Sequence, residues 1–223
     1  MNKKILNTSI AFTFIGVINA AVYIVLMVMG VTPFFMTKAF AFLMIALFFL
    51  AVWVPVIINR IFKINFSLSL VIAYDVFLIM GVLAGTLWEV YKISLVFDKI
   101  VHFASGILIA ILAYDLFSAG NKRKLSPVWT FIVVFSITMM IGGLWEIWEF
   151  AFDMLFEQNS QSWMGFVGHE VLLDTMLDLI CDCAGGILGG LYAAITEWNK
   201  VRVKTTKHRQ VIDVEDVAVA RQQ

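Results

Sequence analysis

Residues 128–150 have the sequence VWTFIVVFSITMMIGGLWEIWEF. About 20 apolar residues cross the hydrocarbon core of a bilayer as a helix, so this segment predicts a membrane span. Its end, LWEIW, places Glu146 between two tryptophans, and residues 87–91 repeat the pattern as LWEVY around Glu89. A charged side chain in hydrocarbon costs about 3 kcal/mol unless it is paired or hydrated. Repeated carboxylates at the ends of two spans therefore indicate a polar site.

The composition extends this prediction to the whole chain of 223 residues, because 61% of them are hydrophobic and only 14% are charged. Such values are typical of a polytopic membrane protein. We predict an all-α fold, a membrane helix bundle that forms one six-span domain over residues 1–198. A basic and then acidic cytoplasmic tail, residues 199–223, is expected to be weakly ordered. The predicted spans are Ser9 to Gly30, Ala39 to Ile58, Leu68 to Tyr91, Lys99 to Phe117, Val128 to Phe150 and Val171 to Thr196.

The basic residues predict the orientation of the spans. With the N-terminus inside, all but three of the 16 Lys and Arg residues fall in inner segments, and Lys38, Lys92 and Lys99 lie outside. Cytoplasmic segments carry an excess of Lys and Arg, so both termini are predicted to be cytoplasmic. The formal net charge is zero, which gives no reason to expect nucleic acid as a partner.

The repeated Leu-Trp-Glu pattern predicts an internal repeat of two helix hairpins, spans three and four and spans five and six, that run parallel to each other. Pro55 lies inside the second span and is expected to kink it. Glycines four residues apart would let spans three and six approach other helices closely, although membrane helices are rich in glycine in any case. These pairs are Gly81 with Gly85, Gly185 with Gly189 and Gly186 with Gly190.

Under this topology, acidic residues gather with His102 at or near the outer face. Asp98 and His102 are four residues apart, as are Asp174 and Asp178, so each pair shares one face of its helix. Asp178 and Asp182 also share a face, and they lie deep in the sixth span, where a carboxylate needs a partner. The predicted catalytic residues are Glu89, Asp98, His102, Glu146, Glu149, Asp174 and Asp178, and the predicted metal ligands are His102, Asp98, Glu146 and Asp178.

Several of these residues also have a structural interpretation. Asp98 and Asp174 would each cap the start of a helix and meet the positive end of its dipole. Glu149 would belong to a charged helix end that rises into water. His102 would be a core histidine that hydrogen-bonds a neighbouring helix, but the aspartate four residues before it favours a functional role.

Glu146 is interpreted as functional because it is deep in its span and repeats Glu89. We expect the side chains of Glu89, His102, Glu146 and Asp178 to line one outward-opening pocket, because repeated hairpins would place them at similar depth. Two further acids, Asp75 and Asp115, lie toward the inner ends of spans three and four. These two acids would form a proton relay. Alternatively, they would pair with each other, or their carboxyl groups would reach the membrane–water interface.

Three motifs together resemble the YjdF-like family of bacterial inner-membrane proteins: DKIVHFASG at residues 98–106, Glu146-x-x-Glu149 and Asp174-Thr175-x-x-Asp178. The Asp-Lys-x-x-His element is also similar to that of the VanZ-like proteins. The resemblance covers about residues 81–190 and implies a multi-span protein of the bacterial inner membrane, but it implies no activity. Phe150 and Met176 depart from the pattern, in which a Trp and a Gln are expected. The characteristic positions it implies are Asp98, Lys99, His102, Gly106, Glu146, Glu149, Asp174, Thr175 and Asp178.

We predict a polar site near the outer leaflet that binds a cation and a lipid-type substrate. Mixed imidazole and carboxylate ligands suit a divalent metal ion such as zinc, manganese or magnesium. A proton- or cation-coupled transporter is the alternative, and a non-catalytic lipid-binding or scaffold protein is the third possibility. No phosphate-binding loop, Gly-x-Ser-x-Gly elbow or His-Glu-x-x-His motif occurs, so the sequence specifies neither a reaction nor an oligomeric state.

Overall fold

A computed structural model of the chain describes residues 3–30, 38–64, 66–120, 125–156, 159–162 and 164–220. All regular secondary structure in these ranges is helical, which confirms the predicted all-α class. The elements are α1 (Lys3–Val28), α2 (Lys38–Val52), α3 (Val54–Phe62), α4 (Leu68–Leu78), the π-helix η1 (Ile79–Leu87), α5 (Val90–Ile93), α6 (Leu95–Gly120), α7 (Pro127–Phe156) and α8 (Glu170–Ala220).

Five stretches of the described chain are long and apolar enough to cross a membrane: Lys3–Val28, Lys38–Phe62, Leu68–Leu87, Leu95–Ser118 and Pro127–Leu155. The second stretch consists of α2 and α3, which are separated at Trp53. Pro55 stands in the first turn of α3, where its missing N–H interrupts the helix that precedes it. The predicted kink at Pro55 is therefore confirmed.

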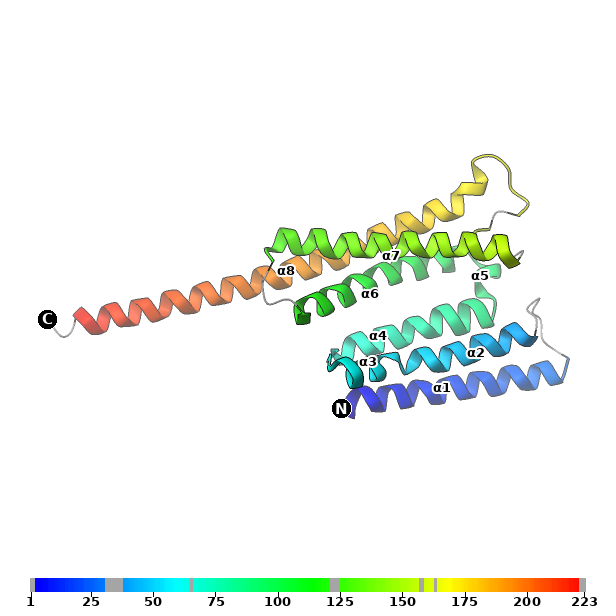
Figure 1. Cartoon of the computed structure of the whole chain (residues 1–223), viewed down its shortest axis with the longest axis horizontal. Coiled ribbons are helices and arrows are strands. Elements are labelled where there is room, and N and C mark those ends of the chain that lie inside the picture. The colour runs from blue at the N-terminus through cyan, green and yellow to red at the C-terminus, as the bar shows by residue number, and fades with distance from the viewer. Residues whose placement is uncertain are drawn as a thin grey trace.

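The helices form two halves, as Figure 1 shows. The N-terminal half contains α1, α2 with α3, and α4 with η1, and the C-terminal half contains α6, α7 and α8. The short helix α5 connects the halves, and α8 extends beyond the bundle at the end where the N-terminus lies (Figure 1). Consecutive long helices run in opposite directions, so the starts of α6 and α8 lie at the same end of the bundle.

Two apolar clusters fill the N-terminal half. We call the first the Phe48 cluster, and it contains Tyr23, Ala41, Phe48, Val52, Leu78, Leu83 and Leu87. We call the second the Val71 cluster, and it contains Ile5, Val56, Phe66, Leu70 and Val71. Leu108, Ile111 and Leu112 of α6 pack against the Val71 cluster and join the two halves.

Glycines allow α6 and α8 to pack with their backbones in contact. A Cβ atom added to Gly106 would lie 2.6 Å from the carbonyl oxygen of Asp182, and one added to Gly185 would overlap the carbonyl oxygen of Phe103. Gly190 lies against the ring of Phe131 on α7 in the same way. Small residues at a membrane helix interface permit this distance of approach, so the prediction for the glycines of the sixth span is confirmed.

The glycines of the third span behave differently. Gly85 of η1 lies against the ring of Tyr91, and Gly81 lies near the Tyr91 hydroxyl. Tyr91 belongs to α5, which follows directly in the chain. The expected contact of Gly81 and Gly85 with another spanning helix is therefore wrong, because the chain turns back after η1 and places its own aromatic ring there.

The two Leu-Trp-Glu stretches also differ from each other. Trp88 ends η1, and Glu89 has the left-handed backbone conformation, with φ of 52°, that breaks the chain before α5. Glu146, in contrast, lies inside α7, which continues to Phe156. The prediction that both stretches end a span is wrong, because only the first contains a residue that leaves the helical conformation.

The helices of the site begin earlier than predicted. Helix α6 begins at Leu95, and the hydroxyl of Ser94 accepts a hydrogen bond from the backbone N–H of Phe97 at 3.2 Å. Helix α8 begins at Glu170, four residues before Asp174. The capping interpretation of Asp98 and Asp174 is therefore wrong, and both side chains are free to face other helices.

Candidate cation site

Six charged or ionisable side chains meet where the first turns of α6 and α8 lie side by side. On each helix they recur at intervals of three or four residues, which places them on the face toward the other helix. The glycine contacts between α6 and α8 bring the two faces within hydrogen-bond distance. We call this set the acidic cluster, and it contains Asp98, Lys99 and His102 from α6 and Asp174, Asp178 and Asp182 from α8.

Lys99 occupies the centre of the acidic cluster. Its Nζ lies 2.8 Å from both carboxylate oxygens of Asp178 and 2.9 Å from Oδ2 of Asp98. Oδ1 of Asp174 and the backbone carbonyl oxygen of that residue are also within hydrogen-bond distance, so the three N–H groups are shared among five acceptors. The side chain of Lys99 is 16% exposed and that of Asp178 is 2% exposed, so these interactions are shielded from water. Lys99 therefore links α6 to α8 through three carboxylates.

His102 lies between three aspartates. Its Nδ1 is 3.3 Å from Oδ2 of Asp182, and its Nε2 is 3.6 Å from Oδ1 of Asp178 and 3.8 Å from Oδ1 of Asp98. The hydroxyl of Ser105 donates to the other oxygen of Asp182 at 2.9 Å. A carboxylate that accepts from Nδ1 fixes the tautomer in which Nε2 carries a lone pair. In that tautomer of His102, the lone pair would point to the space between Asp98 and Asp178.

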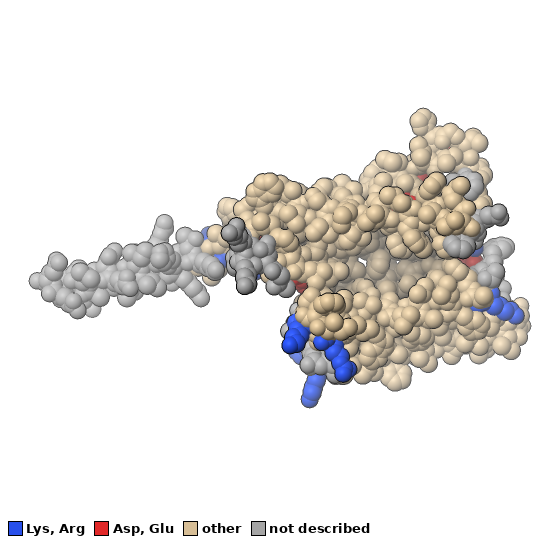
Figure 2. All heavy atoms as spheres, viewed as in Figure 1, with Lys and Arg blue, Asp and Glu red and all other residues tan. Residues whose placement is uncertain are grey.

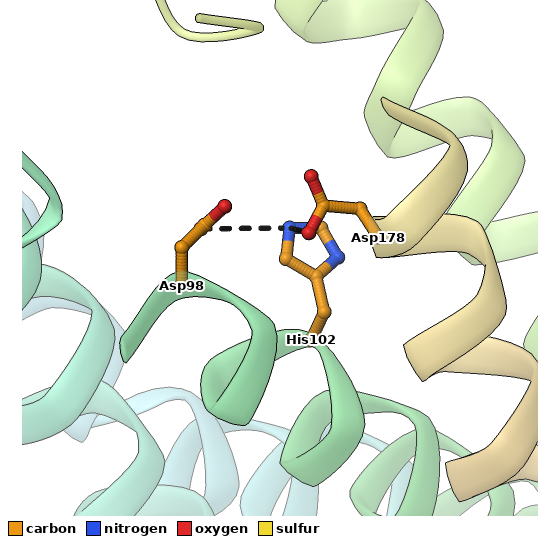
Figure 3. A group of neighbouring side chains, drawn as sticks. All are labelled: Asp98, His102 and Asp178. Carbon is orange, nitrogen blue, oxygen red and sulfur yellow. Dashed lines mark ion pairs between the residues drawn. The ribbon is translucent and has the colours of Figure 1, made fainter. Parts of the chain in front are cut away.

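Figure 3 shows Asp98, His102 and Asp178 directed toward one another across the α6–α8 contact. One ligand atom from each residue lies within 4.8 Å of the others. Two ligands that are each 2.0–2.2 Å from a tetrahedral metal ion lie about 3.4 Å apart. The separations of 3.6 and 3.8 Å from Nε2 to the two Oδ1 atoms are too long for hydrogen bonds, but they suit neighbouring ligands of one cation.

The acidic cluster carries more negative than positive charge. It contains four aspartates but only one lysine and one histidine, so an acidic excess remains even when His102 is protonated. Asp174, Asp178 and Asp182 are all buried. Buried like charges repel strongly in a medium of low dielectric constant, and a bound cation is one way to balance them.

Glu146 approaches the acidic cluster from α7. It is 5% exposed and lies within electrostatic range of His102 and Asp182. Gln161 donates to its Oε2 at 3.4 Å, the Thr175 hydroxyl is near enough to interact with the carboxylate, and no described residue completes a hydrogen bond to Oε1. Gly142, one turn earlier on α7, lies against the carboxylate of Asp182. Helix α7 therefore borders the acidic cluster beside α6 and α8, and it contributes a further carboxyl group, that of Glu146.

The remaining acids of α7 have structural partners. Glu149 accepts a hydrogen bond from the indole N–H of Trp145 at 2.9 Å. Asp153 accepts from the backbone N–H groups of Ser160 and Gln161 at 2.7 and 3.0 Å, which holds the α7–α8 connection against α7. These contacts leave a functional role for Glu149 as a prediction only.

Glu89 stands at the break between η1 and α5. Its carboxylate is 3.1 Å from Nζ of Lys92, and it is near enough to Tyr23 of α1 to interact with it electrostatically. The neighbouring Trp88 donates from its indole N–H to Asn19 of α1 at 3.2 Å. The turn at Glu89 therefore faces the N-terminal half. Of the four side chains expected in one pocket, the structure brings together His102 and Asp178 with Glu146 beside them, and a place for Glu89 in that pocket stays a prediction.

Sequence reasoning missed three parts of the site. The resemblance implied Lys99 as a characteristic position, but its central place among the carboxylates was not predicted. Ser105 is three residues after His102 and so shares its helix face, which would have identified it. No sequence signal identifies Gln161, because it reaches Glu146 from the connection between α7 and α8.

The fold and site define a class: a multi-span helical membrane protein with a buried cluster of acidic and histidine side chains between two of its helices. The chain belongs to the family described as Predicted membrane protein (DUF2238), whose model matches residues 14–199. A protein from Thermotoga maritima, named only as an uncharacterized protein, is 29% identical over 102 residues, which are 45% of this chain and 49% of that protein. The chain thus matches about half the length of this relative. No solved structure matches the chain.

Proposed function

We propose that the acidic cluster binds a divalent cation through Asp98, His102 and Asp178, and that the site acts on a lipid-type substrate near the outer leaflet. The observation that carries the proposal is the spacing of Nε2 of His102 from the two Oδ1 atoms, 3.6 and 3.8 Å, with an acidic excess around them. Asp182 supports the metal-ligating tautomer of His102 from the opposite side of the ring. A cation held there would polarise a substrate oxygen or activate water.

The surroundings of the cluster favour a lipid-type substrate. Trp145, Trp148 and Phe152 form a stacked row on α7, with ring centroids 5.1 and 5.0 Å apart, beside Glu146 and Glu149. Both tryptophans are half exposed. Exposed aromatic rings of membrane helices settle at the level of the lipid headgroups, so a headgroup would meet the α7 side of the cluster. An anionic headgroup would need the cation, because the carboxylates alone would repel it.

We propose that α8 contributes the sixth span, residues 171–196, and that both termini are cytoplasmic in a bacterial inner membrane. Residues 171–196 lie alongside α6 and α7, which cross the bundle in full (Figure 1). In Figure 2, Lys and Arg side chains gather mainly at the end that carries the N-terminus, as expected for a cytoplasmic end. Lys122, Arg123, Lys124 and Arg221, which the topology prediction also uses, lie outside the described residues. The YjdF-like resemblance fits this proposal, and the VanZ-like one stays a prediction, as does the parallel repeat.

The alternatives differ in what they require of Glu146. A scaffold whose acids only form interhelical hydrogen bonds needs both carboxylate oxygens of Glu146 to be satisfied, but Oε1 is buried without a partner in the described part of the chain. The unpartnered oxygen of Glu146 therefore favours a ligand-binding site over a scaffold. A coupled transporter is the second candidate, and it would use the same cation without chemical change of a substrate.

Metal analysis of the purified protein tests the proposal. The full-length protein in detergent, dialysed separately against zinc, manganese and magnesium, is expected to keep one divalent ion per chain. His102→Ala and Asp178→Asn should lose it, whereas His169→Ala, a change of an exposed histidine, should keep it. Equal metal content in all four proteins, or none in the wild type, would rule out the cation site. Binding of anionic lipid only with metal present would support the substrate class.

A further inference from the structure

One buried carboxyl group of the N-terminal half stands apart from the acidic cluster. Asp75 of α4 is 0% exposed, and neither of its carboxylate oxygens has a hydrogen-bond partner among the described residues. No ion pair of the described chain includes it. The expectation that Asp75 pairs with Asp115 or reaches the interface is therefore wrong. The full burial of Asp75 excludes contact with the membrane–water interface. Asp115 lies in the last turns of α6, where its charged neighbour is Lys200.

The position of Asp75 in the packing explains its isolation. Val71, Asp75 and Leu78 lie on one face of α4, since they are four and three residues apart. Val71 belongs to the Val71 cluster and Leu78 to the Phe48 cluster, so Asp75 stands between two apolar clusters. The adjacent Tyr74 is directed elsewhere, because its hydroxyl donates to the carbonyl of Ala51 at 3.0 Å.

A second polar group without a partner occurs on the neighbouring helix α1. Ser9 is 0% exposed, and its hydroxyl has no hydrogen-bond partner among the described residues. On α1 it lies between Ile5 of the Val71 cluster and Tyr23 of the Phe48 cluster. Helices α1 and α4 begin at the same end of the bundle (Figure 1). At 1.5 Å per residue, Ser9 is about 9 Å from the start of α1, and Asp75 is about 10 Å from the start of α4.

We propose that Asp75 is a proton-binding site, held as a neutral carboxylic acid and in exchange with the end of the bundle where α1 and α4 begin. An ionised carboxylate without a partner costs many kcal/mol in such surroundings, so it takes up a proton instead. A metal ion is a poorer fit, because sodium, calcium or magnesium would need several oxygen ligands. Among the described residues of the N-terminal half, only Asp75 and Ser9 have buried side-chain oxygens without a partner. The proton would exchange with the end where α1 and α4 begin because that end is nearer to Asp75. Leu87, at the opposite end of the α4–η1 span, is roughly 18 Å from Asp75.

Dicyclohexylcarbodiimide tests the proposal, because this lipophilic reagent modifies protonated carboxyl groups in apolar surroundings. The full-length protein in detergent is treated over a range of pH and mapped by peptide mass spectrometry. The expected result is an adduct on Asp75 that decreases as pH rises, persists in excess sodium chloride and is kept in the Asp115→Asn control. Protection by sodium would show that the site takes a metal ion and would overturn the proposal.

An infrared measurement covers the case in which the reagent does not reach a fully buried group. A carboxylic acid C=O band should be present in the wild type at neutral pH and absent in Asp75→Asn. A spectrum without that difference, together with no adduct, would also overturn the proposal. Removal of divalent ions with a chelator should change neither result, so this site and the cation site are tested independently.

Discussion

Lys99→Met is the substitution for which the structure predicts the largest loss of stability. Removal of one partner from a buried ion pair typically costs about 3–5 kcal/mol, because the other charge stays buried without compensation. Lys99 donates to three aspartates, two of which, Asp174 and Asp178, are buried. Methionine keeps most of the length and apolar volume of the stem, so the loss would reflect charge and hydrogen bonding rather than a cavity. We expect a decrease of at least 3 kcal/mol in the free energy of unfolding.

Lys92→Met is the matched control. The Lys92–Glu89 pair has a similar length, 3.1 Å, but the side chain of Lys92 is 59% exposed. The side chain of Glu89 is 6% exposed, so this substitution also leaves a buried carboxylate, but only one instead of three, and its loss should be clearly smaller than that of Lys99→Met. Unfolding of both variants in detergent, followed by circular dichroism against denaturant, gives the comparison. A loss in Lys99→Met no greater than that in Lys92→Met would refute the central role of Lys99.

The same experiment separates Lys99 from the proposed cation. Without Lys99, the four aspartates hold a larger acidic excess, so Lys99→Met should bind a divalent ion more tightly than the wild type does. A cation present at 100 times its Kd stabilises the folded state by about 2.7 kcal/mol, which would restore much of the loss. The double variant Lys99→Met with Asp178→Leu should lose less stability than the sum of the single variants. Additive losses, with no effect of metal, would contradict a direct interaction.

Three further predictions follow from the geometry. Gly142→Ala should reduce metal affinity, because the new Cβ would lie 2.6 Å from Oδ2 of Asp182. Gly143→Ala should leave the affinity unchanged, because its Cβ would meet nothing within 4 Å, and isothermal titration of both variants checks this. Asp182→Asn should weaken metal binding about 10- to 100-fold through loss of the carboxylate that orients His102, with little loss of helix content, and an unchanged Kd would argue against that role. Ser160→Cys, in a background without the native cysteines, should react with an impermeant maleimide from the outside of intact cells, and reaction only after permeabilisation would invert the proposed topology.

The positions of the long helices could be predicted from the sequence because the bilayer requires long apolar runs, and such runs are visible without any structure. Helix ends could not. Glu89 and Glu146 stand in nearly identical local sequences, yet Glu89 adopts a left-handed conformation and Glu146 continues a helix. Trp88, directly before the break, donates a hydrogen bond to Asn19 of α1, 69 residues earlier in the chain, and this tertiary contact stabilises the turn at Glu89. The local sequence around Glu89 does not show a contact with a residue so far away in the chain.

Part of the site was predictable for a related reason. The spacing of four residues between Asp98 and His102 fixes a shared helix face before any packing is known. Which helix lies opposite that face, however, depends on the glycines. Gly106 and Gly185 were visible in the sequence, but their contact partners were not, so the sequence alone could not show which helix lies opposite Asp98 and His102.

The glycine contacts also determine whether the site can exist. Nζ of Lys99 reaches a backbone carbonyl of α8, that of Asp174, at 3.3 Å, and a side chain of fixed length can do this only if the helix axes are close. A Cβ on Gly185 would overlap the Phe103 carbonyl and push α8 away from α6. A shift of about 1 Å would lengthen the Lys99–Asp178 hydrogen bonds of 2.8 Å beyond the range in which they are strong. The helix contact and the charge cluster therefore form one cooperative unit, in which loss of packing would release the buried carboxylates to water.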